Sequence, residues 1–150
     1  MQKSYTYHAN AQFHQQDRSF VELEHGAPRT IPFSAPPEFG GQPGMWTPED
    51  FLLAGVASCF VETFKGVAKA SKLEFQGLEV PVEGLIEKES GTLRFTRITI
   101  SPKLIVYRQA DHEAGRRLLA KAEHICLVAR SLQSDITFEP KVLVEEPVAV

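Results

Sequence analysis

The feature that most constrains the fold of this chain is a strong helix start followed directly by a long apolar run. Thr47 is a favourable N-cap residue, Pro48 fits the first helical position, and Asp50 follows Thr47 in capping-box spacing. Residues 51–60 then place apolar side chains around most of the helix circumference. The sequence therefore predicts a buried helix that runs from Pro48 to about Ser71.

The segment before this helix predicts β-strands. Residues 4–24 alternate between polar and apolar side chains around a polar turn, which is typical of a β-hairpin. Residues 31–33 predict a short third strand, and Pro32 favours a sheet edge because proline has no backbone N–H to donate.

The segment after the helix predicts more strands and two further helices. Residues 78–83 and 93–95 alternate, and residues 104–107 continue or extend the last strand. We expect a hairpin turn at Ser90–Gly91 and a bulge between Phe95 and Ile98. We expect a second helix capped by Asp111, a short helix that opens near Cys126, and one closing strand, in this order along the chain. Because regular βαβ alternation is absent, the fold class is α+β with antiparallel sheets, in a single domain that spans residues 1–150.

Charge and hydropathy argue against several classes of function. The net charge of −3 gives no sign of a nucleic-acid partner. No run of 18 apolar residues is present, so we expect no membrane helix and no membrane partner. The first residues lack the apolar core of a secretory signal, which predicts a cytoplasmic protein.

Cys59 and Cys126 are the two cysteines of the chain, 67 residues apart. Structural disulfides are rare in the reducing cytoplasm. Without Cys-x-x-Cys spacing the pair makes a poor zinc site, so we expect no bound metal. Two inert buried thiols and a redox couple remain open alternatives with about equal weight.

A reactive thiol at either position needs its thiolate stabilised. Burial in the apolar run should raise the pKa of Cys59, so a cation or a strong hydrogen-bond donor must compensate. The candidate cations are Arg18, Arg29 and Arg130. Cys126 would instead benefit from the free N–H groups at the start of the short helix.

Four segments in a fixed order resemble the OsmC/Ohr superfamily of osmotically inducible and organic-hydroperoxide-resistance proteins. They are residues 36–41 (PPEFGG), 46–51 (WTPEDF), 57–60 (ASCF) and 122–126 (AEHIC). The helix start, ten residues before the first cysteine, is the most specific of the four, and the PPEFGG loop looks most like an OsmC-like branch.

The resemblance implies a thiol peroxidase for organic hydroperoxides that needs no cofactor. It implies that Cys59 attacks the peroxide, that Cys126 resolves the sulfenic acid to a disulfide, and that an external dithiol reduces that disulfide. The glutamate and arginine of the family's site match Glu49 and Arg18, with Arg29 as the alternative arginine.

Glu49 and Cys59 stand ten positions apart on one predicted helix, which is about 15 Å along its axis. If both act in one small site, a second subunit must supply one of them. The resemblance likewise implies an intertwined homodimer, with antiparallel sheets around a long buried central helix.

Several alternatives stay open. Many family members carry Pro and Ser after the second cysteine, where this chain has Leu127 and Ala129. The protein could therefore be a weakly redox-active dimer that binds an apolar small molecule. Glu49 could simply favour the positive end of the helix dipole, and Arg18 could be a solvated surface charge.

Overall fold

The computed structural model describes residues 3–13, 19–23 and 30–146. The chain divides into two compact units, residues 1–52 and 53–150. Helix α1 (Pro48–Ala70) begins in the first unit and continues in the second. These bounds confirm the predicted helix, which starts at the predicted residue and ends one residue before the predicted end.

The first unit contains a three-stranded antiparallel sheet in the order β1-β2-β3. Its elements are β1 (Ala9–Gln12), β2 (Ser19–Leu23), β3 (Ile31–Phe33) and the 3-10 helix η1 (Pro37–Phe39). β1 pairs with β2 from Ala9 opposite Leu23 to Gln12 opposite Phe20, which confirms the predicted hairpin. Pro32 lies on the edge strand β3, where its missing N–H costs no ladder bond on the outer side.

The predicted capping box closes the start of α1. Thr47 Oγ1 accepts a hydrogen bond from the Asp50 N–H at 3.0 Å, and the Asp50 carboxylate accepts one from the Thr47 N–H at 3.0 Å. The ring of Phe51 stacks on Trp46 with centroids 5.6 Å apart, and meets Phe33 edge-on at 6.1 Å. Polar capping and aromatic packing together fix where the helix begins.

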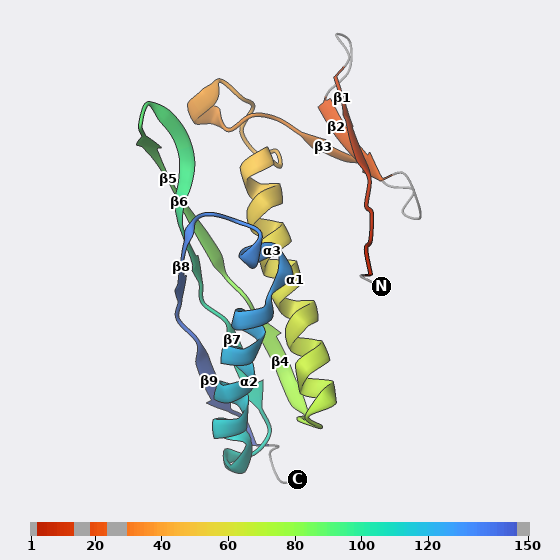
Figure 1. The fold of residues 1–150 in the computed structure, drawn as a ribbon, viewed down its shortest axis with the longest axis vertical. Helices are drawn as coiled ribbons and strands as arrows, with labels where there is room; N and C mark the ends of the chain where they lie inside the picture. The colour runs from red at the N-terminus through yellow and green to blue at the C-terminus, as the bar shows by residue number, and fades with distance from the viewer. Residues whose placement is uncertain (1–2, 14–18, 24–29, 147–150) are drawn as a thin grey trace. The chain divides into compact units, whose positions relative to one another are not determined.

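The second unit contains two three-stranded sheets and most of the helical residues. Its elements are β4 (Phe75–Glu79), β5 (Val82–Glu89), β6 (Thr92–Ile100), β7 (Lys103–Val106), the 3-10 helix η2 (Gln109–Asp111), α2 (His112–Ile125), α3 (Leu127–Arg130), β8 (Asp135–Phe138) and β9 (Lys141–Val144). The sheet orders are β4-β7-β9 and β5-β6-β8 (Figure 1). The β4–β7 and β5–β6 pairs are antiparallel, while β7–β9 and β6–β8 are parallel. The fold class is therefore α+β, as predicted, and the sheets are mixed.

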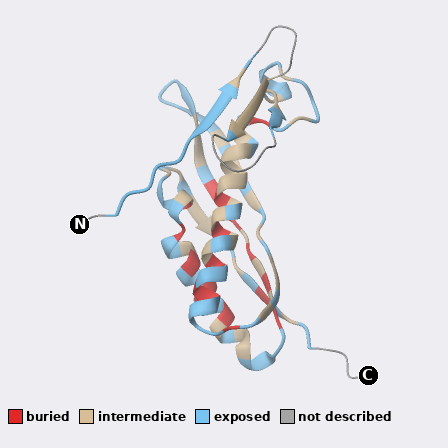
Figure 2. Ribbon diagram, turned by 90° about the vertical axis from the view of Figure 1, so that its right-hand side faces the viewer, coloured by how far each residue is buried: buried red, intermediate tan, exposed pale blue. Residues whose placement is uncertain are grey.

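The core of this unit lies between the helices and the strands, where the buried residues gather in Figure 2. Phe60 and Phe64 of α1 are fully buried. Phe60 lies 6.1 Å from Phe138 of β8, and Phe64 lies 5.2 Å from Phe75 of β4, both measured between ring centroids. These contacts anchor the middle of α1, including the segment that carries Cys59, against both sheets.

The predicted hairpin turn and bulge are both present. Ser90 and Gly91 have φ angles of 52° and 83°, as expected for a tight turn between β5 and β6. The register shifts so that Leu85 and Ile86 face Arg97 and Phe95, which leaves Thr96 as the extra residue of the bulge.

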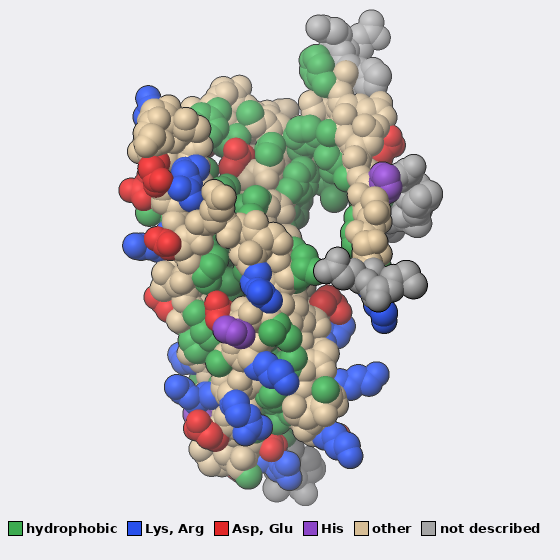
Figure 3. All heavy atoms as spheres, viewed as in Figure 1, with side chains coloured by type: hydrophobic (Ala, Val, Ile, Leu, Met, Phe, Trp, Pro, Cys, Tyr) green, Lys and Arg blue, Asp and Glu red, His purple; other side chains and the backbone are tan. Residues whose placement is uncertain are grey.

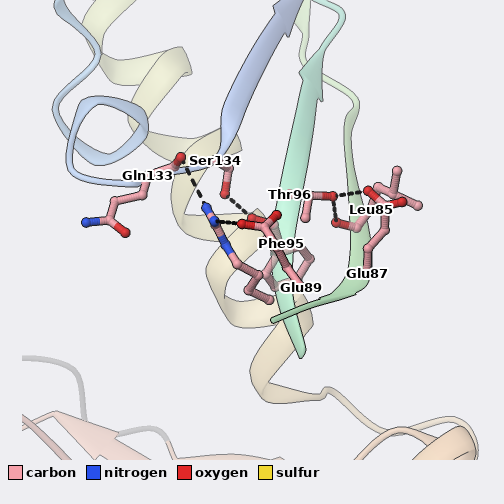
Figure 4. A network of polar contacts seen from close by, with 8 residues as sticks. Leu85, Glu87, Glu89, Phe95, Thr96, Gln133 and Ser134 are labelled. Carbon is pink, nitrogen blue, oxygen red and sulfur yellow. Dashed lines mark hydrogen bonds and ion pairs between the residues drawn. The ribbon is translucent and has the colours of Figure 1, made fainter. Parts of the chain in front are cut away.

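A polar network surrounds this bulge and joins β6 to the loop before β8 (Figure 4). The hydroxyl of Ser134 donates to the Phe95 carbonyl at 2.7 Å, and Arg94 donates to the carbonyl of Gln133 at 3.3 Å and to Glu89 at 2.8 Å. These bonds hold the incoming chain beside β6, where β8 then pairs in parallel.

Two local predictions are wrong. Asp111 occupies the N-cap of α2 without capping it, because its carboxylate instead accepts two hydrogen bonds from Arg108, at 2.9 and 3.1 Å. The predicted single closing strand is two strands in different sheets, β8 and β9. Pro140 separates them, since it cannot donate a ladder hydrogen bond, and the N–H groups of Glu139 and Lys141 bond to Ile100 and Pro102.

The surface chemistry and the length of α1 bear on membranes and nucleic acids. Lysine and arginine side chains are interspersed with acidic ones and form no single basic patch on the face drawn in Figure 3. By length and composition alone, α1 is long and apolar enough to cross a membrane. A core helix of a globular protein meets the same criterion, and Val56, Phe60 and Phe64 are buried in such a core.

Candidate functional site

Cys59 lies half-buried on α1, beside the short helix α3. A Cβ atom built on Gly55, one turn earlier, would lie 3.9 Å from a methyl group of Val128, an ordinary van der Waals distance, so α3 packs beside this turn of α1. One turn later, the Thr63 hydroxyl lies 3.9 Å from the Cys59 sulfur, within the range of a hydrogen bond to sulfur.

Cys126 forms the junction between α2 and α3. Its φ and ψ angles of −61° and 112° are extended, so the residue ends one helix and begins the next. The break leaves the N–H groups of Leu127 and Val128 without intrahelical partners, as in the first turn of any helix. Hydrogen bonding from both N–H groups lowers the pKa of the Cys59 thiol. The side chain of Cys126 is fully buried.

Both cysteines are free thiols, and each shifts the pKa of the other, so the two side chains lie near each other. This mutual effect argues against two thiols buried far apart. Burial raises the pKa of Cys59, but hydrogen bonds from the Val128 N–H, the Cys126 thiol, the Thr63 hydroxyl and the Leu127 N–H lower it further than burial raises it. The net result is a pKa below the ordinary range of a cysteine thiol.

The pKa of Cys126 moves in the opposite direction. Burial raises it, the Ala129 and Val128 N–H groups oppose that rise, and the neighbouring Cys59 sulfur raises it again. The helix start therefore lowers the pKa of Cys126 as expected, but desolvation and Cys59 outweigh it and the net shift is upward. The Cys126 thiol in turn lowers the pKa of Cys59 by hydrogen bonding.

The predicted arginine beside Cys59 stays a prediction. Among the described residues, the groups that lower the pKa of Cys59 are neutral. Arg130 is exposed at the end of α3, and Arg18 and Arg29 lie outside the described residues. Thr63 was missed, although a hydroxyl four residues after a cysteine on one helix is a signal that the sequence does carry.

Glu49 lies in the first turn of α1, within the first unit. One oxygen of its carboxylate, Oε2, is buried and has no hydrogen-bond partner among the described residues. A buried carboxylate oxygen without a donor is costly, which is unusual for a residue that merely favours a helix dipole. The structure places Cys59, Cys126 and Thr63 together in the second unit, and Glu49 is not among them.

Within the described residues, no group of three or more His, Cys, Asp or Glu side chains could hold a metal ion. A groove of about 670 Å³ lies at the β5 edge of the second unit, lined by Glu83, Thr99 and Glu139 among others. No cysteine lines it, so it is separate from the thiol pair.

Residues 41–141 match the family model described as OsmC-like protein. The chain belongs to the OsmC-like family. The matched segment contains both cysteines, Glu49 and Thr63, so the thiol pair described above belongs to the part of the chain that defines the membership.

Known proteins agree with this assignment. The OsmC-like chain is 27% identical to the uncharacterized protein YmaD of Bacillus subtilis over 110 residues, 71% of this chain and 73% of YmaD. An OsmC-like protein of unknown function from Vibrio cholerae has the same fold, with a TM-score of 0.82 at 16% identity, over 91% of this chain and 99% of its own. An organic hydroperoxide resistance protein from Legionella pneumophila also shares the fold, with a TM-score of 0.72 at 24% identity, over 95% of this chain and 100% of its own.

Proposed function

We propose that this OsmC-like protein is a cysteine-based peroxidase for organic hydroperoxides that acts in defence against oxidative stress. The observation that carries the proposal is a pair of free thiols near enough to shift each other's pKa, whose pKa values move in opposite directions. A nucleophilic thiolate beside a protonated thiol is the arrangement that such a reaction needs. The hydroperoxide resistance protein that shares this fold supports the substrate class.

In the first step the Cys59 thiolate attacks one oxygen of the hydroperoxide. An S–O bond forms, the O–O bond breaks, and the leaving alkoxide takes up a proton to become an alcohol. Sulfur is oxidised by two electrons to sulfenic acid, and the peroxide is reduced by the same two. The Leu127 and Val128 N–H groups, which lower the pKa of Cys59, favour the thiolate that acts as the nucleophile.

In the second step the Cys126 sulfur attacks the Cys59 sulfenic acid. A disulfide forms, and the hydroxide that leaves combines with the Cys126 proton to give water. An external dithiol then reduces the disulfide and returns both residues to thiols. Cys126 needs no depressed pKa for this step, because its target lies near it and the departing hydroxide accepts its proton.

The working unit in this proposal is an intertwined homodimer in the cytoplasm, built from one domain per chain. Glu49 of one subunit and Arg18, or Arg29, would complete the site around Cys59 of the other. Only 28% of the most apolar 18-residue window of α1 is buried within one chain, so a partner helix has apolar surface left to cover. The buried Glu49 oxygen without a donor supports an arginine partner.

The test is stopped-flow mixing of the reduced full-length protein with cumene hydroperoxide, followed by mass spectrometry of the products. We expect rapid consumption of the peroxide and a Cys59–Cys126 disulfide. Cys59→Ser should remove both, while Ser58→Ala, which changes the neighbouring residue on the same helix, should keep both. Peroxide consumption that is slow in the wild type, or equal in Cys59→Ser, would overturn the proposal.

Size-exclusion chromatography with light scattering tests the dimer separately. We expect twice the chain mass of 16.7 kDa at micromolar concentration. A monomer that consumes peroxide at full rate would leave the chemistry standing and remove the shared site.

A further inference from the structure

Thr63 has an unusual hydrogen-bond partner for a hydroxyl residue in a helix. Serine and threonine in helices commonly donate to the carbonyl four residues earlier, as Ser58 does to Ala54 at 2.7 Å and Ser131 does to Leu127 at 2.8 Å. The Thr63 hydroxyl instead lies 3.9 Å from the sulfur of Cys59, the side chain of the residue four positions earlier.

We propose that Thr63 is a positioning residue for the peroxidase nucleophile, whose hydroxyl donates to the Cys59 thiolate and fixes the direction in which the sulfur points. The proposal rests on the proposed function for the reaction, but the contact itself does not. Thr63 is not among the residues that the family resemblance implies for the site, and its side chain is uncharged.

The geometry follows from the helix. Residues four apart lie on the same face, one turn above the other, so Thr63 is held beside Cys59 by α1 itself. Its β-branched side chain has few rotamers in a helix, which limits the places that the hydroxyl can reach. The contact is therefore built into a rigid element and needs no loop movement to form.

Ionisation of Cys59 decides the direction of this hydrogen bond. Between two neutral groups, either the thiol or the hydroxyl could donate. A thiolate has no proton, so Thr63 must then donate, and the bond favours the charged form of the sulfur. Cys126, at the junction of α2 and α3, is the other titratable group against the sulfur. The charged side chains on either side of Thr63, Glu62 and Lys65, are exposed and pair with each other at 3.2 Å.

The test compares Thr63→Val, which removes the hydroxyl and keeps the shape, with Thr63→Ser, which keeps a hydroxyl. Alkylation of Cys59 by iodoacetamide is followed across pH by mass spectrometry of the Cys59 peptide in the full-length reduced protein. We expect Thr63→Val to raise the measured pKa of Cys59 by about half a pH unit and to slow alkylation at neutral pH about threefold. Thr63→Ser should restore most of the wild-type value.

Ser58→Ala is the matched control, because its hydroxyl lies next to Cys59 in the chain but bonds to a carbonyl. An unchanged pKa in Thr63→Val, an equal change in Ser58→Ala, or a Thr63→Ser variant as slow as Thr63→Val would overturn the proposal. If Thr63→Val loses the circular dichroism spectrum of the folded protein, Thr63→Ala against Thr63→Ser makes the same comparison. This readout contains no peroxide, so a changed pKa together with an inactive wild type would reject the peroxidase and keep Thr63 in its role.

Discussion

The two cysteines show how one residue type acquires opposite properties within a single pair. Cys59 is half-buried on a long helix, and two backbone N–H groups, a hydroxyl and a thiol lower its pKa. Cys126 is fully buried at a break between two helices, and the Ala129 and Val128 N–H groups only partly offset the effect of that burial on its pKa. The donors outweigh desolvation at the first sulfur and lose to it at the second.

This difference teaches that neutral donors can lower the pKa of a half-buried thiol. Each donor is weak alone, but several neutral donors near one atom can offset the cost of burying a charge. The short helix α3 affects both thiols. The N–H groups of its first residues lower the pKa of Cys59, and Cys126, which precedes them, is fully buried.

The largest expected effect is a difference in peroxide consumption between variants that lack one or the other thiol. Cys126→Ser should still react with one equivalent of cumene hydroperoxide, because the nucleophile remains, but should stop there as a sulfenic acid. Cys59→Ser should not react at all. The measurement is peroxide consumed per subunit, with dimedone labelling and mass spectrometry to locate the sulfenic acid. Labelling of Cys126 in place of Cys59 would reverse the assigned roles.

A second contrast concerns alkylation in the native state. Cys59 should react with iodoacetamide at neutral pH at least about tenfold faster than Cys126, because its pKa is lowered while that of Cys126 is raised and its side chain is fully buried. Peptide mass spectrometry after timed quenching gives both rates from one sample. The same measurement in denaturant is the control, and there the two rates should converge. Equal alkylation rates of Cys59 and Cys126 in the folded protein would contradict the difference between their pKa values.

A third contrast is the pH dependence of stability in single-cysteine variants. Cys59 has a lowered pKa in the folded state, so with Cys126→Ser, which keeps a donor at that position, the stability should rise with pH between the folded pKa and the unfolded pKa. Cys126 has a raised pKa whose largest cause is burial, so with Cys59→Ser the stability should fall as pH rises above the unfolded pKa. Urea unfolding across mildly alkaline pH, with the double serine variant subtracted, gives the two slopes. Slopes of the same sign would contradict the comparison.

The sequence predicted the elements better than it predicted the site. The capping box, the N-terminal hairpin and the bulge at Thr96 each follow from short local patterns, and all three are present. The parallel pairing of β8 with β6 and of β9 with β7 could not be predicted. It depends on contacts between residues distant in sequence, such as the hydrogen bond from Ser134 to Phe95.

At the site, the sequence identified both cysteines but misjudged what surrounds them. Backbone N–H groups carry no residue identity, so their convergence on Cys59 depends on the extended backbone at Cys126 and is invisible in the amino-acid pattern. Burial of Cys59 predicted a cation beside it, and that prediction stands untested because Arg18 and Arg29 lie outside the described residues. Within those residues, a local break in a helix supplies neutral donors. Arg18 and the role of Glu49 remain predictions.

The smallest expected effect tests the break between α2 and α3 directly. Many family members carry proline where this chain has Leu127, and proline has no N–H to donate to Cys59. Leu127→Pro should be tolerated, because position 127 is the first residue of α3 and Cys126 already has the extended backbone that proline requires before it. It should raise the measured pKa of Cys59 slightly and slow alkylation at neutral pH about twofold. The melting temperature should change little, since the leucine side chain is 70% exposed.

Leu127→Ala, which removes the side chain and keeps the N–H, is the matched control, and its Cys59 should be alkylated at the wild-type rate. If the two variants alkylate Cys59 at the same rate, the Leu127 N–H does not stabilise the thiolate, and the neutral stabilisation of Cys59 then depends on Val128, Cys126 and Thr63.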